Sequence, residues 1–399
     1  MNKALFLLVT LFVALTAQAV PTAAAPGIGD STPKYTFNSA TGELTLNWGE
    51  FDRYDNWDYD VTNTSVKSVT ATSEVSFTGD CSQLFYNFNH CQSMDLSRVN
   101  TSGMTSANRM FRDCTSLTTL DLSGWNMANV TDMYEMFKYC ESLTSLNLSG
   151  WNTGNVIDMG LMFYDCYHLT SLDIRGWNTA NVTDMYYMFS GCESLTTLDL
   201  SGFNTANVSS MTQMFYGCRK LTSINLTGWN TSHVMTMGAM FAGCTGLTSL
   251  DISGWNTANV WYMNDMFANC SALRTIYAGT GWTTYNVYGE WGEGMFTNCT
   301  ALVGAEGTAY DANHTDKTYA RIDEGARNPG YFTGRHTSMR GDVNMDGNVT
   351  IADVTDLIDI LLGSVLTVYD MNAADADRDG KITIADVTAL IDYLLSHHW

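Results

Sequence analysis

Positive charge is scarce in this sequence. Lysine and arginine together number 19 against 41 aspartates and glutamates, which leaves a formal net charge of −22 over 399 residues. A nucleic-acid-binding surface needs a basic face, so this composition argues against nucleic acid as a partner. Long apolar runs are also scarce. Beyond the N-terminus no stretch approaches the roughly 20 apolar residues that a membrane span needs, and we expect no transmembrane segment.

Signatures of catalysis are missing too. The seven histidines are scattered, and the sequence holds no His-Glu-x-x-His, no Gly-x-Ser-x-Gly and no phosphate-binding loop. A glycosidase pair of carboxylates is spatial rather than sequential, so it would leave no such signature, but nothing in the sequence favours one. We therefore predict that the protein is not an enzyme.

The first residues indicate export. Lys3 supplies a positive charge, Ala4–Leu15 is an apolar stretch, and Ala17-Gln18-Ala19 is a cleavage site of small residues. This order is typical of a signal peptide over residues 1–19, followed by a linker over 20–34. We expect a protein that is secreted or held at the cell surface.

A strict repeat fills the middle of the chain. Cysteines recur every 26 residues from Cys114 to Cys270, and the next, Cys299, follows after 29. Each closes a Met-Phe-x-x-Cys block, and those from Cys114 to Cys244 are followed by Leu-x-x-Leu-x-Leu with occasional Ile for Leu. A fixed period of this length predicts a solenoid in which each coil covers the apolar face of its neighbour. We place the solenoid at 91–300, an N-terminal cap at 35–90 and a C-terminal cap at 301–335.

Two elements are expected in each coil. The Leu-x-Leu pair alternates as a β-strand does, which predicts a stacked parallel sheet. Val130, Met133, Met136 and Phe137 have helical spacing, and Asp132 with Glu135 resembles a capping box before them. The predicted fold class is therefore an α/β repeat, a leucine-rich-repeat-like solenoid with one strand plus one short helix per 26-residue coil.

The repeated columns predict a core. Equivalent cysteines on adjacent coils each have two neighbours, so we expect buried free thiols, with Cys81–Cys91 as the best candidate for a disulfide. The column of tryptophans that includes Trp125 and Trp151 could stack sugars or form a corner of the core. Along the strands, a ladder of hydroxyls with an acidic or amide rung could bind a partner, or could be the default polar face of a copied repeat.

Aromatic residues that vary between coils are the candidates for target binding, with partial burial between short helices as the alternative. They are Tyr134, Tyr164, Tyr186, Tyr187, Tyr216, Trp261 and Tyr262.

The repeat motif resembles the BspA-like leucine-rich-repeat surface proteins of Bacteroidetes-type bacteria. It reads Leu-Thr-Ser-Leu-Asp-Leu-Ser-Gly-Trp-Asn-Thr-x-Asn-Val-x-x-Met-x-x-Met-Phe-x-x-Cys. The resemblance implies a surface or secreted binding protein, and some relatives act as adhesins.

Two near-identical loops 33 residues apart lie at the C-terminal end, beginning at Asp342 and Asp375. Oxygen side chains fall at loop positions 1, 3, 5, 9 and 12, with glycine at position 6. This is the spacing of a calcium loop of the EF-hand type. Because position 12 is Asp and no amphipathic helix precedes Asp342, the segment 338–399 resembles a type I dockerin.

That resemblance implies a small all-α duplicated F-hand module that binds two Ca²⁺ ions and docks onto a cohesin-like domain of another protein. In the first loop the implied ligands are Asp342, Asn344, Asp346, the carbonyl of Asn348, Thr350 through water, and Asp353. In the second loop they are Asp375, Asp377, Asp379, the carbonyl of Lys381, Thr383 through water, and Asp386.

In dockerins, loop positions 10 and 11 carry much of the partner recognition. Here those positions are Ile351-Ala352 and Ile384-Ala385. Identical pairs in both halves suggest a pseudo-symmetric docking face, while the alternative is that Ile351 and Ile384 pack inside the module.

Together these features predict a non-catalytic exported binding or adhesion protein. Its solenoid would contact a host or bacterial surface protein or a glycan, and its tail would dock in a calcium-dependent manner. The alternative is a scaffold or substrate-binding subunit of an extracellular polysaccharide-degrading complex.

Overall fold

The computed structural model describes residues 33–55, 61, 65–334, 340–344, 349–363, 371–379 and 381–396. The predicted signal peptide and two predicted calcium ligands, Asp346 and Asn348, lie outside these residues. The solenoid and the C-terminal module are described separately below.

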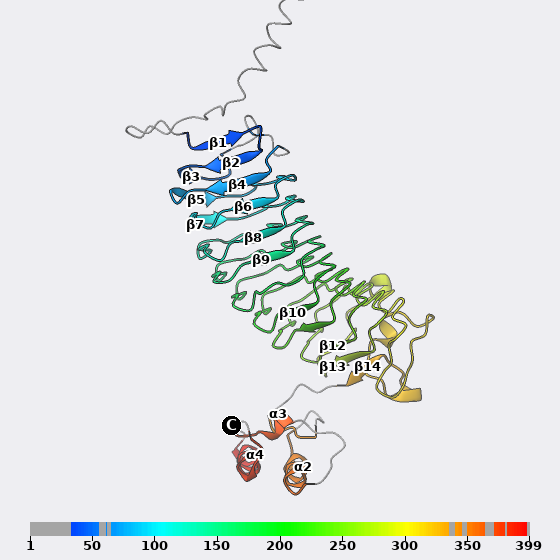
Figure 1. Ribbon diagram of the computed structural model, residues 1–399. Helices are drawn as coiled ribbons and strands as arrows, with labels where there is room; N and C mark the ends of the chain where they lie inside the picture. The colour runs from blue at the N-terminus through cyan, green and yellow to red at the C-terminus, as the bar shows by residue number, and fades with distance from the viewer. Residues whose placement is uncertain are drawn as a thin grey trace, which may run out of the picture.

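The solenoid is a stack of coils that carries two ladders of strands at its N-terminal end (Figure 1). The first ladder starts with the antiparallel pair β1–β2, and parallel pairing then continues through β4, β6, β8 and β9. The second ladder joins β3, β5 and β7. The strands are β1 Tyr35–Asn38, β2 Glu43–Leu46, β3 Gly49–Phe51, β4 Ser68–Ala71, β5 Val75–Asp80, β6 Ser93–Asp95, β7 Asn100–Ser106, β8 Thr119–Asp121 and β9 Ser145–Asn147.

Beyond the first ladder the predicted Leu-x-Leu strands recur in separate groups, because residues 171–174 form no strand. Thr119 pairs with Ser145, 26 residues later, and Thr197 pairs with Ser223 in the same way. In the strands centred on Leu120, Leu146 and Leu198 the central side chain is buried and the flanking polar side chains are exposed. The later strands are β10 Thr197–Asp199, β11 Ser223–Asn225, β12 Ser249–Ile252, β13 Thr275–Ala278 and β14 Phe332–Gly334.

The second ladder persists beyond β7 as single parallel bridges. They run from Ser106 through Asp132, Asp158 and Asp184 as far as Tyr262, one residue per coil. The solenoid therefore keeps two lines of backbone pairing, and the short Met-Phe segments complete each coil.

Those Met-Phe segments are not helical, so the predicted short helix per coil is wrong. Met136 N bonds to Met133 O at 3.2 Å within the coil, whereas Phe137 N bonds to Met162 O at 2.9 Å in the next coil. Glu135 and Tyr139 have φ values of 56° and 62°, a left-handed conformation that an α-helix excludes. The physical reason is that the next coil presents backbone carbonyls to these amides. A row of tight turns can form hydrogen bonds to those carbonyls, whereas a helix would satisfy its amides internally.

Stacked side chains fill the interior. Phe111 and Phe137 are parallel to within 1° at 5.5 Å between ring centroids, and this column continues coil by coil to Phe296. The repeat tryptophans, among them Trp125 and Trp255, are buried, which confirms that they form a corner of the core.

The ten cysteines are all buried free thiols, as predicted for the repeat column. Each repeat thiol donates to a carbonyl of the preceding coil, for example Cys140 Sγ to Phe111 O at 3.2 Å. The predicted Cys81–Cys91 disulfide is wrong. Cys81 Sγ faces the carbonyl of Phe51 and Cys91 Sγ faces that of Ser93, so the two thiols occupy different positions in the core.

A compact segment covers the C-terminal end of the solenoid. It contains the 3-10 helices η1 Gly289–Gly292, η2 Lys317–Tyr319 and η3 Gly325–Arg327, and β14 returns to pair with β13. The carboxylate of Asp323 is buried at the centre of this segment. It accepts hydrogen bonds from the backbone amides of Glu306 and Thr308 at 2.9 and 3.0 Å and from the Thr308 hydroxyl at 2.7 Å.

The described residues of the C-terminal module form three helices, α2 Ile351–Leu361, α3 Met371–Ala374 and α4 Ile384–Ser396. α2 and α4 pack against each other around a small core of Val354, Leu357, Val387 and Leu390. The predicted class of a leucine-rich-repeat-like solenoid followed by a small all-α module is thus confirmed, apart from the helix within each coil. Among the described residues, no helix has the length and apolarity to cross a membrane.

Candidate calcium, docking and target-binding sites

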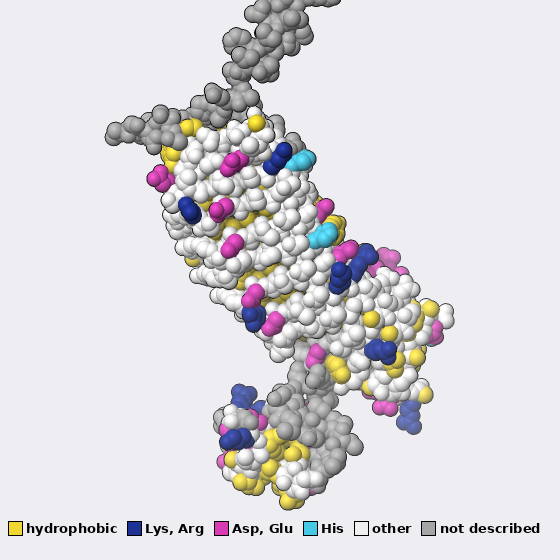
Figure 2. Space-filling model, in the orientation of Figure 1, with side chains coloured by type: hydrophobic (Ala, Val, Ile, Leu, Met, Phe, Trp, Pro, Cys, Tyr) yellow, Lys and Arg dark blue, Asp and Glu magenta, His cyan; other side chains and the backbone are white. Residues whose placement is uncertain are grey.

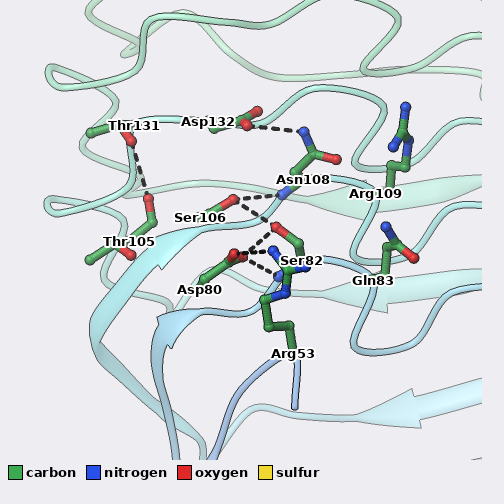
Figure 3. A pocket seen from close by; sticks show the side chains of 10 residues that line it. All are labelled: Arg53, Asp80, Ser82, Gln83, Thr105, Ser106, Asn108, Arg109, Thr131 and Asp132. Carbon is green, nitrogen blue, oxygen red and sulfur yellow. Dashed lines mark hydrogen bonds and ion pairs between the residues drawn. The ribbon is translucent and has the colours of Figure 1, made fainter. Parts of the chain in front are cut away.

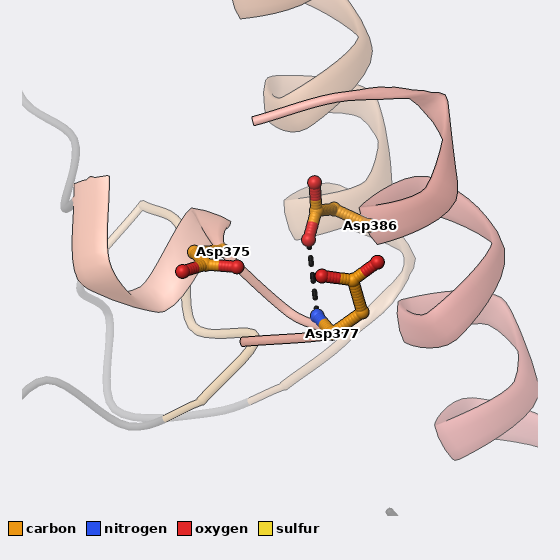
Figure 4. A group of neighbouring side chains, drawn as sticks. All are labelled: Asp375, Asp377 and Asp386. Atoms are coloured by element: carbon orange, nitrogen blue, oxygen red, sulfur yellow. Dashed lines mark hydrogen bonds between the residues drawn. The ribbon is translucent and has the colours of Figure 1, made fainter. Parts of the chain in front are cut away.

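Three carboxylates meet in the second C-terminal loop. Asp375, Asp377 and Asp386 each offer an oxygen, and these oxygens all lie within 4.8 Å of one another. Asp375 follows α3 and Asp386 belongs to the first turn of α4, so the loop between the two helices brings them together (Figure 4). Hard oxygen donors at this separation suit Ca²⁺, and this donor set fits the predicted ion.

The buried Asp386 organises this loop. Its Oδ1 accepts the backbone amide of Asp377 at 3.0 Å, and its Oδ2 accepts that of Thr383 at 2.7 Å. Each carboxylate oxygen has a second lone pair, so these bonds orient the group and still leave acceptor capacity for a cation. Desolvation together with the neighbouring carboxylates Asp386 and Asp379 raises the pKa of Asp377, as expected where like charges crowd together.

The first loop repeats this arrangement. Asp353 Oδ1 accepts the amide of Asn344 at 3.2 Å, and its Oδ2 accepts that of Thr350 at 2.8 Å. Asp342, the first position of the loop, is buried. The same two bonds at the same spacing occur in both loops, so the described residues of each half fold alike.

Other predicted ligands have backbone roles in the structure. The hydroxyl of Thr350 caps α2 by accepting the amide of Ala352 at 3.2 Å, and that of Thr383 accepts the amide of Ala385 at 3.1 Å. Asp379 Oδ1 accepts the amide of Lys381 at 2.9 Å. Their roles as ligands stay predictions.

The positions predicted to dock are exposed. Ile351 and Ile384 leave 70% and 71% of their surface accessible, so the alternative in which they pack inside the module is wrong. Ala352 and Ala385 are exposed as well. Two further pairs with the same 33-residue spacing, Ile358 with Ile391 and Leu362 with Leu395, are also exposed, and Figure 2 shows apolar side chains gathered on the visible face of this module.

On the solenoid, the predicted target-binding aromatics fall into two groups. Tyr134, Tyr164, Tyr186 and Tyr187 are half-buried and contact one another or neighbouring side chains. The hydroxyl of Tyr186 donates to that of Tyr134 at 3.2 Å from two coils away, and its ring passes over Gly160 in between. Tyr164 contacts Tyr187 at 5.9 Å between ring centroids. The rings of this group therefore contact mainly one another and neighbouring side chains.

The second group keeps free ring surface. Tyr216 and Trp261 are exposed, and Tyr262 lies beside Trp261 at 5.9 Å between centroids.

An open depression of about 490 Å³ lies at the N-terminal end of the second ladder (Figure 3). Its polar groups bond mainly to each other: Arg53 Nη1 pairs with Asp80 Oδ2 at 2.8 Å, and Asn108 Nδ2 donates to Asp132 Oδ2 at 2.9 Å. These pairings leave the depression poor in groups directed at a ligand.

Comparison with known protein families places both parts of the chain. The model described as "Mycoplasma protein of unknown function, DUF285" matches residues 50–171, 79–198, 144–225 and 193–308, which together span 50–308. The chain belongs to the DUF285 family of BspA-like repeats. The model described as "Dockerin type I domain" matches residues 340–395, and such domains bind calcium.

Solved leucine-rich-repeat structures also resemble this DUF285 protein. A leucine-rich-repeat protein of T. pallidum shares 15% identity over 61% of this chain and 91% of its own, with a TM-score of 0.31. A leucine-rich cell surface protein of Faecalibacterium prausnitzii shares 17% over 70% and 94%, with a TM-score of 0.28. One from Bacteroides ovatus shares 15% over 70% and 82%, with a TM-score of 0.33. No curated protein matches the chain.

The DUF285 solenoid contains a charge cluster that sequence reasoning missed. The side chain of Glu135 is 4% exposed and pairs with Arg109 at 2.6 Å, with Lys138 at 2.8 Å and with Arg112. Burial favours the neutral acid, but hydrogen bonds from Lys138 and Arg109 outweigh it and lower the pKa of Glu135. The sequence alone predicts a helix cap for Glu135, because the two arginines that pair with it come from the neighbouring coil.

Trp291 was missed as well. Its ring centroid lies 5.0 Å from that of Trp261. The available signal was the 29-residue step from Cys270 to Cys299, since insertions in a repeat form loops that often lie on the binding face.

Proposed function

We propose that the protein is a non-catalytic exported binding protein with two separate contact surfaces. The solenoid, over residues 91–300 with its caps, contacts a protein, cell-surface or glycan target. The module, over 338–399, binds two calcium ions and docks onto a cohesin-like partner, which fixes the solenoid to a surface or an assembly.

One observation carries the docking part of this proposal. Ile351 and Ile384 protrude at equivalent places in the two halves, each at position 10 of a loop whose last aspartate is oriented by the same pair of backbone amides. An apolar side chain with about 70% of its surface in water gains free energy when a partner covers it. Calcium would hold both loops in shape, so the docking face would depend on the ion.

The alternative, a scaffold or substrate-binding subunit of an extracellular polysaccharide-degrading complex, uses the same module. It differs only in the target of the solenoid, and it is favoured by the exposed aromatic rings near Trp261. Both functions therefore predict the same behaviour of the tail.

The test is a capture experiment with the full chain immobilised. Envelope and secreted proteins of the source organism are passed over it in calcium and in chelator, and retained proteins are identified by mass spectrometry. We expect a calcium-dependent partner that contains a cohesin-like domain. The double variant Ile351→Asp with Ile384→Asp should lose this partner while calcium still induces the helical circular dichroism of the module.

The matched control is Asp392→Asn, which alters an exposed residue of α4 outside the loop and should retain the partner. Equal capture with and without calcium, or no cohesin-like partner in either condition, would refute the docking proposal and leave function with the solenoid.

A further inference from the structure

A cluster of exposed aromatic rings lies at the C-terminal end of the solenoid. Trp261 is 40% exposed and Trp291 42%. Tyr288, three residues before Trp291, is 60% exposed, and Met235, whose carbonyl accepts the Trp261 amide, is 47% exposed. The planes of the two tryptophans are inclined at 62° with their centroids 5.0 Å apart, so the rings form a corner. Among the described residues most phenylalanines and tryptophans are buried, so these two exposed tryptophans are different.

The backbone holds this corner rigidly. Trp261 N bonds to Met235 O at 3.0 Å in the preceding coil, and Met263 N bonds to Trp291 O at 2.8 Å in the following one. Trp291 belongs to η1, which begins at Gly289, where φ is 51°. The three extra residues of this coil therefore bulge outward and bring a second tryptophan beside the first.

Tyr262 supports the corner from the other side. Its ring lies so close to Gly238 that an added Cβ there would come within 2.1 Å of the tyrosine Cε1. Only glycine permits this approach, and the tyrosine ring in turn contacts Trp261. The platform is thus preorganised, which reduces the entropy lost when a ligand binds.

The charges around the rings limit the class of ligand. Glu290 and Glu293 flank Trp291, and Asp265, whose amide bonds to the carbonyl of Glu293 at 3.0 Å, follows Trp261; all three side chains are exposed or half-buried acids. Lys317 lies near η1 with its Nζ bonded to the carbonyl of Val287, so these three acids and one lysine together carry a net negative charge. An acidic rim repels sulfated or uronic polymers and anionic membranes, whereas carboxylates accept hydrogen bonds from hydroxyl groups.

We propose that Trp261 and Trp291 form a binding platform for a neutral glycan. The apolar C–H face of a sugar ring would stack on one indole while the second indole flanks it, and the carboxylates would accept its hydroxyls. This inference rests on the proposed function, in which the solenoid binds a target, and it names the class of that target.

The test is affinity gel electrophoresis of the full chain in gels that contain one soluble polymer each. The neutral polymers are xyloglucan, mixed-linkage β-glucan, galactomannan and arabinoxylan, and chondroitin sulfate is the acidic comparison. We expect retardation by at least one neutral polymer and none by chondroitin sulfate. Trp261→Ala and Trp291→Ala should each weaken the binding about tenfold or more, which is typical of an aromatic hot spot.

Tyr285→Ala is the matched control, because this aromatic side chain is 80% exposed and should not be needed for binding. Trp291→Phe should recover part of the affinity, since it restores a ring. Circular dichroism checks that each variant keeps its fold. Retardation that is unchanged in both tryptophan variants, or no retardation by any neutral polymer, would overturn the platform.

This outcome is separable from failure of the proposed function. Absent or unchanged retardation by the neutral polymers, together with a surface protein that binds the wild-type chain and Trp291→Ala equally, would overturn the glycan platform but leave the target-binding solenoid in place. Loss of calcium-dependent capture, by contrast, concerns only the module.

Discussion

The backbone amide of Asp377 donates a hydrogen bond to Oδ1 of Asp386 at 3.0 Å, and the amide of Asn344 makes the equivalent bond to Asp353 at 3.2 Å. In both loops the third residue is thereby fixed to the last one, which sits at the start of a helix. The carboxylate at position 12 therefore connects an early residue of the loop to the start of the helix through its own hydrogen bonds.

Substitution of Asp386 should weaken calcium binding at the second site selectively. Asp386→Asn removes a negative charge and one of two anionic oxygens, so we expect the affinity of that site to fall by about tenfold or more while the first site still binds. Isothermal titration calorimetry on the full chain would resolve the two sites. Asp392→Asn makes the same chemical change on α4 outside the loop and should leave both affinities unaltered. Identical titrations for wild type and Asp386→Asn would contradict the assignment.

The charge cluster at Glu135 should be costly to break. Glu135→Gln leaves Arg109, Arg112 and Lys138 close together without their shared carboxylate, and we expect a loss of about 3 kcal/mol in the free energy of unfolding. Urea titration followed by tryptophan fluorescence measures it. Glu193→Gln, which breaks an exposed pair with Arg219, is the control and should cost below about 1 kcal/mol.

The same cluster has a pH signature. Because the pKa of Glu135 is lowered in the folded protein, its stabilising effect is present above the unfolded pKa of about 4.3 and is lost as the pH falls through the folded pKa. The difference in stability between wild type and Glu135→Gln should therefore shrink on acidification below about pH 4. A difference that grows instead would show that the carboxylate is not held as an anion.

Asp184 should behave in the opposite way. Burial, with a smaller effect from the Asp158 carboxylate in the preceding coil, raises the pKa of Asp184 to about 6. A raised pKa means that the folded state holds the proton more tightly, so this carboxyl stabilises the protein at low pH and loses that effect as the pH rises through about 6. Asp184→Asn keeps the acceptor for the Tyr186 amide and should stabilise the chain at pH 7.5, on the order of 1 kcal/mol after solvent screening.

The control for this prediction is Asp199→Asn. Hydrogen bonds from Ser201 lower the pKa of Asp199, so its substitution should destabilise slightly at pH 7.5 or have no effect. Thermal unfolding at pH 4.5 and 7.5 compares the variants. A stabilisation by Asp184→Asn that is as large at pH 4.5 as at pH 7.5 would refute the titration argument.

Much of the architecture follows from patterns of fixed spacing. The 26-residue period predicts the solenoid, Leu-x-Leu predicts the strands of which Leu120 is the centre, and the repeated loop predicts the meeting of Asp375, Asp377 and Asp386. In each case the pattern is local or repeated, so the structure of one repeat predicts the structure of the others.

What escaped prediction depends on contacts between coils. The spacing of Met133, Met136 and Phe137 suits a helix when one coil is considered alone, but the carbonyls of the next coil capture the amides and the segment folds into turns. Trp261 and Trp291 lie together because the three inserted residues of the later coil form a bulge. The repeat period reveals the insertion but does not predict where its residues lie in space. A single sequence shows directly which residues are adjacent along the chain. It shows only indirectly which residues of different coils are in contact.

The turn geometry itself can be tested at Ala239. This residue has a φ of 51°, which costs a non-glycine residue roughly 1 kcal/mol, whereas glycine adopts it freely but loses about 0.5–1 kcal/mol more backbone entropy on folding. The two effects nearly cancel, so Ala239→Gly should leave the free energy of unfolding within about 0.5 kcal/mol of wild type. Ala242 lies in the same coil at a buried position without a left-handed backbone. Ala242→Gly relieves no backbone strain there and only adds the entropy loss, so it should lower the free energy of unfolding by about 1 kcal/mol. Urea titration of both variants measures these changes in the free energy of unfolding. Equal losses at the two positions would mean that Ala239 is not left-handed in solution. The segment would then form the helix that the sequence alone predicts, in place of the row of turns.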